Sequence, residues 1–313
     1  MNTTYTPSAT LLTYSVAETT PYINWIYFFH AWGFPPRFAA ISRIHGCDAC
    51  RAGWLAEFPE EERARAAEAM QLFKDANRML AQLDGDFHTH VRFGLYPACS
   101  DGDDLLLTDP EQEGRTLRLA LLRQQHTTKP DEPYLCLSDF VRPLSQGISD
   151  TVGVFAATVD ADMEHLYETG AYADDFKHLL AQTLSDRLAE ASTEKMHQEV
   201  RTTYWGYAKD EQWSIEDLLV EKFTGIRPAG GRLSFPAGPV CQLRAVGMVG
   251  VSGNRYPADR KRSHGAACFG KRTHTVPSLR TLLCHRKNRG RPVGRLCSAT
   301  RPARGNDAQI LSR

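Results

Sequence analysis

Residues 91–121 read VRFGLYPACSDGDDLLLTDPEQEGRTLRLAL, and this stretch decides the fold class. Apolar residues alternate with more polar neighbours near both of its ends, which is typical of strands that bury one face. The alternating residues are Val91, Phe93, Leu95, Leu117, Leu119 and Leu121. A turn rich in Asp and Gly lies between them at residues 101–104, and connections this short join antiparallel strands. We therefore expect a meander of antiparallel strands.

Helical patterns lie on both sides of the meander. Residues 61–83 repeat apolar side chains at steps of three and four, with charged residues on the other face, and Pro59 precedes them where a helix start tolerates proline. A second long helix is predicted from Asp174 to about Tyr204, after a short one over residues 162–168. A last helix over residues 214–222 begins with the capping signature Ser-Ile-Glu-Asp.

Two apolar runs complete this outline. Residues 152–159 predict a central strand, and residues 22–32, YINWIYFFHAW, predict a buried helical segment rich in aromatic side chains. The aromatic run could also form a wall for a ligand, although burial in the core is favoured. Strands flanked by helices without a regular βαβ alternation indicate an α+β fold with one mostly antiparallel sheet.

The charge of the chain changes sign near Gly231. Residues 232–313 carry 17 Lys and Arg against two Asp, so residues 1–231 hold the other 20 basic and 35 acidic residues of the chain. We expect a polar, Thr-rich lead-in at residues 1–20, a folded domain over residues 21–231, and a basic tail over residues 232–313. The tail shows no sustained period and is poor in aromatics, so disorder is expected there.

Length and composition exclude several classes of protein. No stretch approaches the ~20 consecutive apolar residues of a membrane span, and the N-terminus lacks a basic segment followed by an apolar run. Eight Cys are scattered, four on each side of the charge break, which does not indicate a disulfide framework. These features predict a soluble, cytoplasmic protein without a membrane partner.

Two local patterns could bind a metal ion. Cys47 and Cys50 follow His45, but a structural zinc site needs four ligands and the other cysteines before the break, Cys99 and Cys136, are isolated. A local turn with free thiols is therefore favoured over a metal or redox site. His88-Thr89-His90 could place two ligands on one strand face, but no partner is evident and surface polarity is favoured. We predict no metal site and no catalytic residue.

Two further patterns bear on ligand binding. Asp186 and Glu190 are four residues apart and so share one helix face; spacing alone favours a solvated face, whereas a pair in a cleft would suit a cationic amine or sulfonium group. In the loop at residues 227–231, Arg-Pro-Ala-Gly-Gly, an Arg held by Pro and Gly could present a planar fork to a carboxylate. Such loops are common, and the pattern alone is weak.

Taken together, these residues resemble the C-terminal reactivation domain of cobalamin-dependent methionine synthase, from about Thr20 to Gly231. The motifs stand in the family's order. They are PYINW at 21–25, LLRQQ at 121–125, LSDFV at 137–141, DTVGVF at 150–155, LSDRLAEA at 184–191, YWGYA at 204–208 and GIRPA at 225–229.

The resemblance implies a C-shaped α+β domain that binds S-adenosylmethionine (AdoMet) in a shallow groove. It implies a methyltransferase role: the domain docks over cobalamin, which is bound by a partner domain absent from this chain. A flavodoxin-type donor supplies an electron, and the methyl group of AdoMet converts cob(II)alamin to methylcobalamin. The cofactor carries the chemistry and the domain supplies orientation.

By the same resemblance, the cofactor-binding residues are Asn24, Glu190, Arg227 and Ala229. Arg227 holds the AdoMet carboxylate, the Ala229 backbone lies in the same loop, and Glu190 borders the groove. Many members have Asp where this chain has Asn24, which loses a charge and keeps hydrogen-bonding capacity. Arg232 stands where the family has Tyr, and the family's later strand and final helix are not visible. We therefore expect weak AdoMet binding or none, and impaired activity.

The basic tail has two interpretations. Its charge would suit nucleic acid, although no recognisable nucleic-acid module is present, which argues against that partner. Alternatively, codons can be chosen from Pro239 onward so that an adjacent reading frame spells family-like text. We favour this frameshift, between Gly231 and Ala237. Two other functions stay open: a binding protein whose basic tail contacts nucleic acid, and a standalone reactivase for a separate cobalamin protein.

Overall fold

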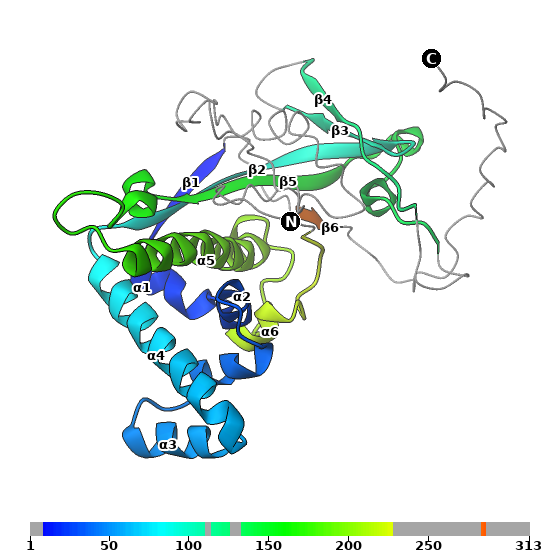
Figure 1. Cartoon of the computed structure of the whole chain (residues 1–313). Coiled ribbons are helices and arrows are strands. Elements are labelled where there is room, and N and C mark those ends of the chain that lie inside the picture. Colours follow the sequence, from blue (N-terminus) through cyan, green and yellow to red (C-terminus); the bar gives the residue numbers. More distant parts are fainter. Residues whose placement is uncertain (1–8, 110–113, 126–132, 228–282, 286–313) are drawn as a thin grey trace, which may run out of the picture.

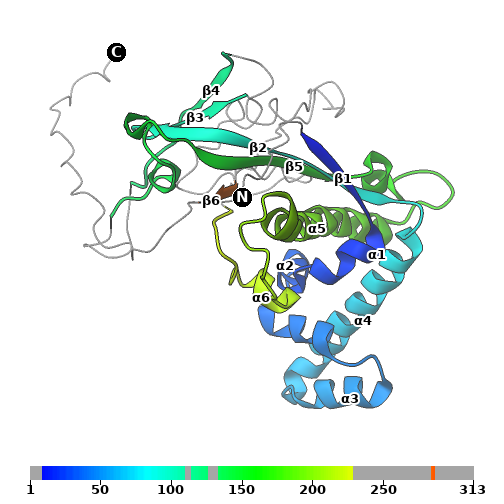
Figure 2. The ribbon, with the colours of Figure 1, turned by 180° about the vertical axis from the view of Figure 1, so that it is seen from behind.

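The computed structural model describes residues 9–109, 114–125, 133–227 and 283–285 of the chain. An antiparallel sheet lies on one side of the molecule and the α-helices lie on the other (Figure 1). The view from behind shows the same two parts (Figure 2). The α+β class and the antiparallel sheet predicted from the sequence are confirmed.

The sheet is built around one long strand. In the part of the chain that the structure describes, its strands are β1 (Thr10–Ser15), β2 (His88–Asp101), β3 (Asp104–Thr108), β4 (Thr116–Leu119), β5 (Asp150–Val159) and β6 (Leu283–His285). Strand β2 pairs with β5 along ten residues on one side. On its other side, β1 pairs with the first part of β2 and β3 with the last part, while β4 extends the sheet beyond β3. The meander and the central strand over residues 152–159 are thus confirmed.

The beginning of the chain differs from its predicted role as a lead-in. From Thr10 on, residues enter the sheet as β1, with Tyr14 buried, and then form α1 (Val16–Thr19) and a 3-10 turn, η1 (Thr20–Tyr22). Ser15 caps α1 in a reciprocal capping box with Glu18. The Thr-rich composition that suggested a linker also has high strand propensity, and pairing with β2 makes use of it.

The prediction for the tail lies almost wholly outside the described residues. Only β6 is described there, and it pairs antiparallel with β5 from Thr151 to Gly153.

After α1 and η1, the helical segments that precede β2 form an arm whose core is aromatic. They are α2 (Trp25–Ala31), the 3-10 segment η2 (Pro36–Arg43), α3 (Asp48–Ala56) and α4 (Glu60–Leu83). Phe28 and Phe29 of α2 are fully buried, and Phe38 packs against Trp54 and Phe58. This confirms the buried aromatic helix and the amphipathic helix, whose buried side includes Ala66, Ala69, Ala76, Leu80 and Leu83. Helix α3 lies at the end of α4 farthest from the sheet (Figures 1 and 2).

Helix α5 (Asp175–Glu199) joins the arm to the sheet. Leu180, Leu184 and Leu188 belong to the core of the arm, whereas Met196 and Val200 pack with Val91, Phe93 and Phe155 of the sheet.

The predicted helix to Tyr204 ends as a π-helical turn, Val200–Tyr204, and the short helix predicted over residues 162–168 is the 3-10 segment Ala161–His165. Helix α6 (Ile215–Leu219) starts at the predicted capping box of Ser214 and Asp217. Shorter 3-10 segments are Leu137–Phe140 and Leu144–Gln146.

Candidate functional site

One face of α5 carries a row of polar residues that the fold covers. The helix begins where the Asp174 side chain accepts a hydrogen bond from the Lys177 backbone N–H at 3.0 Å. Steps of three and four place residues on one helix face. The row consists of Asp186, Glu190, Glu194 and His197. Because α5 is wedged between the arm and the sheet, this face is not freely solvated, contrary to the solvated face that spacing alone favoured.

The two predicted carboxylates of this row are partly buried. Glu190 pairs with Arg187 at 2.7 Å, and both side chains are less than one fifth exposed. Burial raises the pKa of Asp186 to about 6; Arg187 opposes this shift, while Glu164 and Glu190 add to it. A partly buried carboxylate beside a second carboxylate is a favourable environment for a cationic ligand group.

The predicted Arg227 lies against the same helix, one turn beyond Glu190. Its guanidinium forms an ion pair with Glu194 and has its Nη1 atom 3.2 Å from His197 Nδ1. The arginine side chain is only 6% exposed, so it is held in one place. Because Nη1 donates, Nδ1 of His197 accepts, and this tautomer carries its hydrogen on Nε2.

His197 is a buried neutral base beside this arginine. Burial holds its pKa well below the usual range, and Arg227 and Arg201 push it in the same direction. Its Nε2 atom has no hydrogen-bond partner among the described residues. A buried N–H without a partner is uncommon and marks a place where a further acceptor would be stabilising.

A second buried ion pair lies near His197 and is formed by Arg201 and Glu211. Arg201, in the π-helical turn, donates to the Glu211 carboxylate from Nε and Nη2, and the two side chains are 1% and 4% exposed. The Phe223 ring packs edge-on against His197 and lies 4.3 Å from the Arg201 guanidinium carbon. The segment after α6 is therefore held on α5 as far as Arg227. We call Glu194, His197, Arg201, Glu211 and Arg227 the α5 polar cluster.

Asn24 lies at the start of α2, where its side chain accepts a hydrogen bond from the Ile26 backbone N–H at 3.1 Å. Just before it, the Tyr22 hydroxyl donates to Gln198 of α5 at 2.8 Å. Residue 24 is thus positioned near the C-terminal half of α5, as Glu190 and Arg227 are. Ala229 lies outside the described residues.

Sequence reasoning did not single out Glu194, His197, Arg201 or Glu211. One signal could have found the first two, because they continue the spacing of Asp186 and Glu190 along one helix face. Glu221, just before Phe223, has a positive φ of 60°, which is unusual for a residue other than glycine and no sequence pattern indicates it.

The sequence matches the family described as "Vitamin B12 dependent methionine synthase, activation domain" over residues 15–243, most of the chain. The chain belongs to this family. It is also similar to the solved structure described as "Crystal Structure of the MetH Reactivation Domain bound to AdoHcy", with 33% sequence identity and a TM-score of 0.60. That match covers 74% of this chain and 66% of the solved chain.

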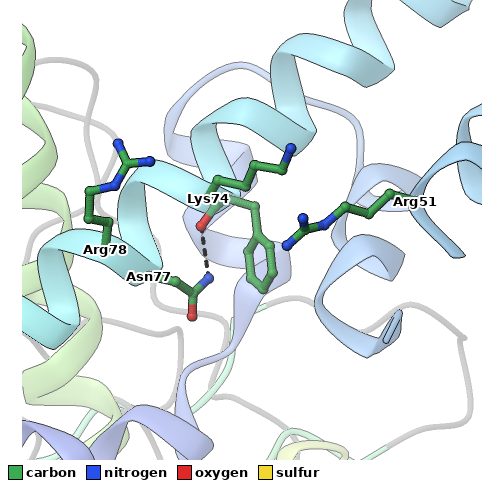
Figure 3. Close-up of a pocket in the computed structure, with 5 residues that line it drawn as sticks. Arg51, Lys74, Asn77 and Arg78 are labelled. Atoms are coloured by element: carbon green, nitrogen blue, oxygen red, sulfur yellow. Dashed lines mark hydrogen bonds between the residues drawn. The ribbon is translucent and has the colours of Figure 1, made fainter. Parts of the chain in front are cut away.

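A pocket of this activation domain lies on other elements than the α5 polar cluster. An open pocket of about 360 Å³ lies between α3 and α4, lined by Arg51, Phe73, Lys74, Asn77 and Arg78 (Figure 3). No residue predicted to bind the cofactor lines it. The resemblance implies a shallow groove rather than a deep pocket, and the loop that includes Ala229 lies outside the described residues.

The remaining sequence patterns of the activation domain lie apart from α5. His90 and His88 both approach Asp160 after β5: His90 Nε2 is 2.8 Å from the carboxylate, and the His88 backbone N–H donates to it. Asp160 is therefore the partner that was not evident in the sequence.

His45, Cys47 and Cys50 come together at the start of α3. Among the described residues, none of the helices combines the length and apolar character needed to cross a membrane.

Proposed function

We propose that this activation domain binds AdoMet on the face of α5 that carries Glu190 and Glu194, with Arg227 as the carboxylate ligand. The observation that carries the proposal is the position of Arg227, whose side chain is almost fully buried and held on α5. It lies beside His197, whose Nε2 atom has no hydrogen-bond partner among the residues that the structure describes. Binding of AdoHcy by a similar domain supports it, since AdoHcy is AdoMet without its transferable methyl group.

The roles follow from charge and hydrogen-bonding capacity. A guanidinium has five N–H donors, so the pairing of Arg227 with Glu194 leaves capacity for a ligand carboxylate. Glu190 and Asp186 supply negative charge for the sulfonium or amino group. Asn24 offers an amide in place of a carboxylate, which lowers the expected affinity for the amino group.

The domain would act on a cobalamin held by another domain. With one electron from a flavodoxin-type donor, the methyl group of AdoMet converts cob(II)alamin to methylcobalamin and leaves AdoHcy. This chain would bind and orient AdoMet. We propose these partners, a cytoplasmic location and methyltransferase activity for this domain. The alternative is a standalone reactivase that serves a separate cobalamin protein. The family match favours this function over a nucleic-acid-binding protein.

Calorimetric titration with AdoMet tests the site. We expect measurable binding by a version with the family's reading frame restored after Gly231, and weaker or no binding by the present chain. In the restored version, R227K keeps the charge but loses the planar fork, and we expect a loss of affinity of roughly 10- to 100-fold. The control R118A removes an arginine of β4 and should leave the affinity unchanged. Failure of the restored version to bind AdoMet would overturn the site.

Resequencing the gene tests the interpretation of the tail. A single-nucleotide shift between the codons of Gly231 and Ala237 would support it. A tail peptide found by mass spectrometry in an intact frame would defeat it.

A further inference from the structure

The start of α3 brings three metal-ligating side chains to one place, far from the α5 polar cluster. One donor atom each of His45, Cys47 and Cys50 lies within 4.8 Å of the others. Helix α3 is at the end of the arm, away from the sheet (Figures 1 and 2). We propose that His45, Cys47 and Cys50 bind one thiophilic divalent cation, Zn²⁺ in the first place, with a fourth position open to water.

The distances suit this ion. Zn–S bonds of about 2.3 Å and Zn–N bonds of about 2.0 Å in a tetrahedral site place ligand atoms about 3.5–3.8 Å apart. The three donor atoms are already within about 1 Å of that spacing, and the side chains of His45 and Cys50 are exposed, so small rotations can close the difference. Three protein ligands with an open fourth position are typical of exchangeable or catalytic zinc sites rather than closed structural ones.

Local backbone structure orders the two thiols. Cys47 is the N-cap of α3, and its Sγ accepts a hydrogen bond from the Cys50 backbone N–H at 3.3 Å. This bond orders the Cys47-x-x-Cys50 segment, whose spacing is one that zinc sites use. Neither thiol is joined in a disulfide.

The residue that follows the two thiols faces a different feature of the arm. Arg51 follows directly, 3.7 Å from Asp48, and lines the pocket of Lys74 and Arg78, into which Figure 3 shows it pointing from α3.

Binding releases protons in a defined balance. Each Sγ–H bond breaks, an Sγ–Zn bond forms, and the proton passes to buffer, while neutral His45 contributes a nitrogen lone pair. No electron is transferred, so the step needs no oxidant or reductant. A neutral complex results from Zn²⁺ and two thiolates.

The test uses the full chain with Cys241, Cys268, Cys284 and Cys297 replaced by Ser, under reducing conditions, so that other thiols of the tail do not contribute. Titration with Co²⁺ should give a thiolate-to-cobalt charge-transfer band and the strong visible bands of a four-coordinate site, saturating at one equivalent. Zn²⁺ should abolish both. C47S and C50S should each weaken binding by more than about 100-fold, since even outer-shell changes cost about 10- to 100-fold.

Two controls keep the proposal falsifiable. C99S removes a thiol of β2 whose Sγ lies 3.5 Å from Ser149 Oγ, and should leave the cobalt spectrum unchanged. H45N should weaken binding and alter the visible bands while keeping the charge-transfer band. The absence of the band in the reduced parent, or an unchanged band in C47S and C50S, would overturn the site. AdoMet affinity should not change on adding Zn²⁺, which separates this site from the proposed function.

Discussion

The α5 polar cluster and the proposed zinc site (His45, Cys47 and Cys50) each gather several titratable side chains, but in opposite environments. The cluster is buried between helices and pairs its charges within the protein: Arg201 with Glu211, and Arg227 with Glu194. The proposed zinc site is at the tip of the arm, where Cys47 is half-buried and Cys50 is exposed. Removing one partner of a buried ion pair lowers the free energy of unfolding strongly. Exposed charged groups contribute little to it and stay accessible to an external ion.

The largest expected effect comes from breaking the buried pair of Arg201. R201A leaves the carboxylate of Glu211 buried without its partner, and we expect a loss of about 3–5 kcal/mol in the free energy of unfolding. Urea denaturation followed by circular dichroism measures it. R118A is the matched control, because Arg118 pairs with Asp101 and Asp104 in the open. Equal effects of the two substitutions would remove the contrast between buried and exposed charge.

A gain in stability is expected at Asp186. Its folded-state pKa of about 6 is above its ordinary value of 3.8, so the folded protein binds more protons than the unfolded chain between these pH values. The charged carboxylate therefore opposes folding above pH 6. D186N should raise the free energy of unfolding by about 1–3 kcal/mol at pH 8 and by less at pH 4. A loss of stability at pH 8 would contradict the assignment.

The buried His197 makes the opposite contribution to the pH dependence. Its pKa is depressed in the folded state, so the unfolded chain binds more protons and stability falls as the pH drops below the ordinary histidine pKa of about 6.5. We expect its contribution to approach about 1.4 kcal/mol per pH unit between pH 6 and 5. Denaturation of H197N at both pH values measures how much of the dependence is lost; H178N, at an unrelated histidine of α5, is the control.

The smallest effect on stability is expected at the thiols. Without metal, C47S and C50S should leave the free energy of unfolding unchanged. Cys50 is exposed, Cys47 is only half-buried, and Ser is a good N-cap residue in place of Cys47. With Zn²⁺, the parent should gain stability and the variants should not. Thermal melts with and without Zn²⁺ check this. A large loss of thermal stability in C47S without metal would show that the Cys47 thiol has a structural role.

Sequence patterns predicted the regular elements well and the site only in part. The alternation at residues 91–95 and the steps along residues 61–83 are local, and the structure confirms both. The carboxylates of Asp186 and Glu190 were expected on a solvated face, because spacing defines a helix face but not what covers it. The pairing of Arg227 with Glu194 joins residues 33 positions apart and has no local signal. Likewise, Asp160 meets His90 only because β5 pairs with β2.

By itself, the sequence determined the meander, the central strand, the long helices and the capping box at Ser214. It also determined the family resemblance and the charge reversal near Gly231. Period, capping chemistry and composition are properties of neighbouring residues. Tertiary structure decided which charges are buried, which tautomer His197 adopts, and that Thr10–Ser15 is a strand of the sheet. The physical reason is that burial and ion pairing depend on the distance between atoms in space, which residue spacing along the chain does not specify.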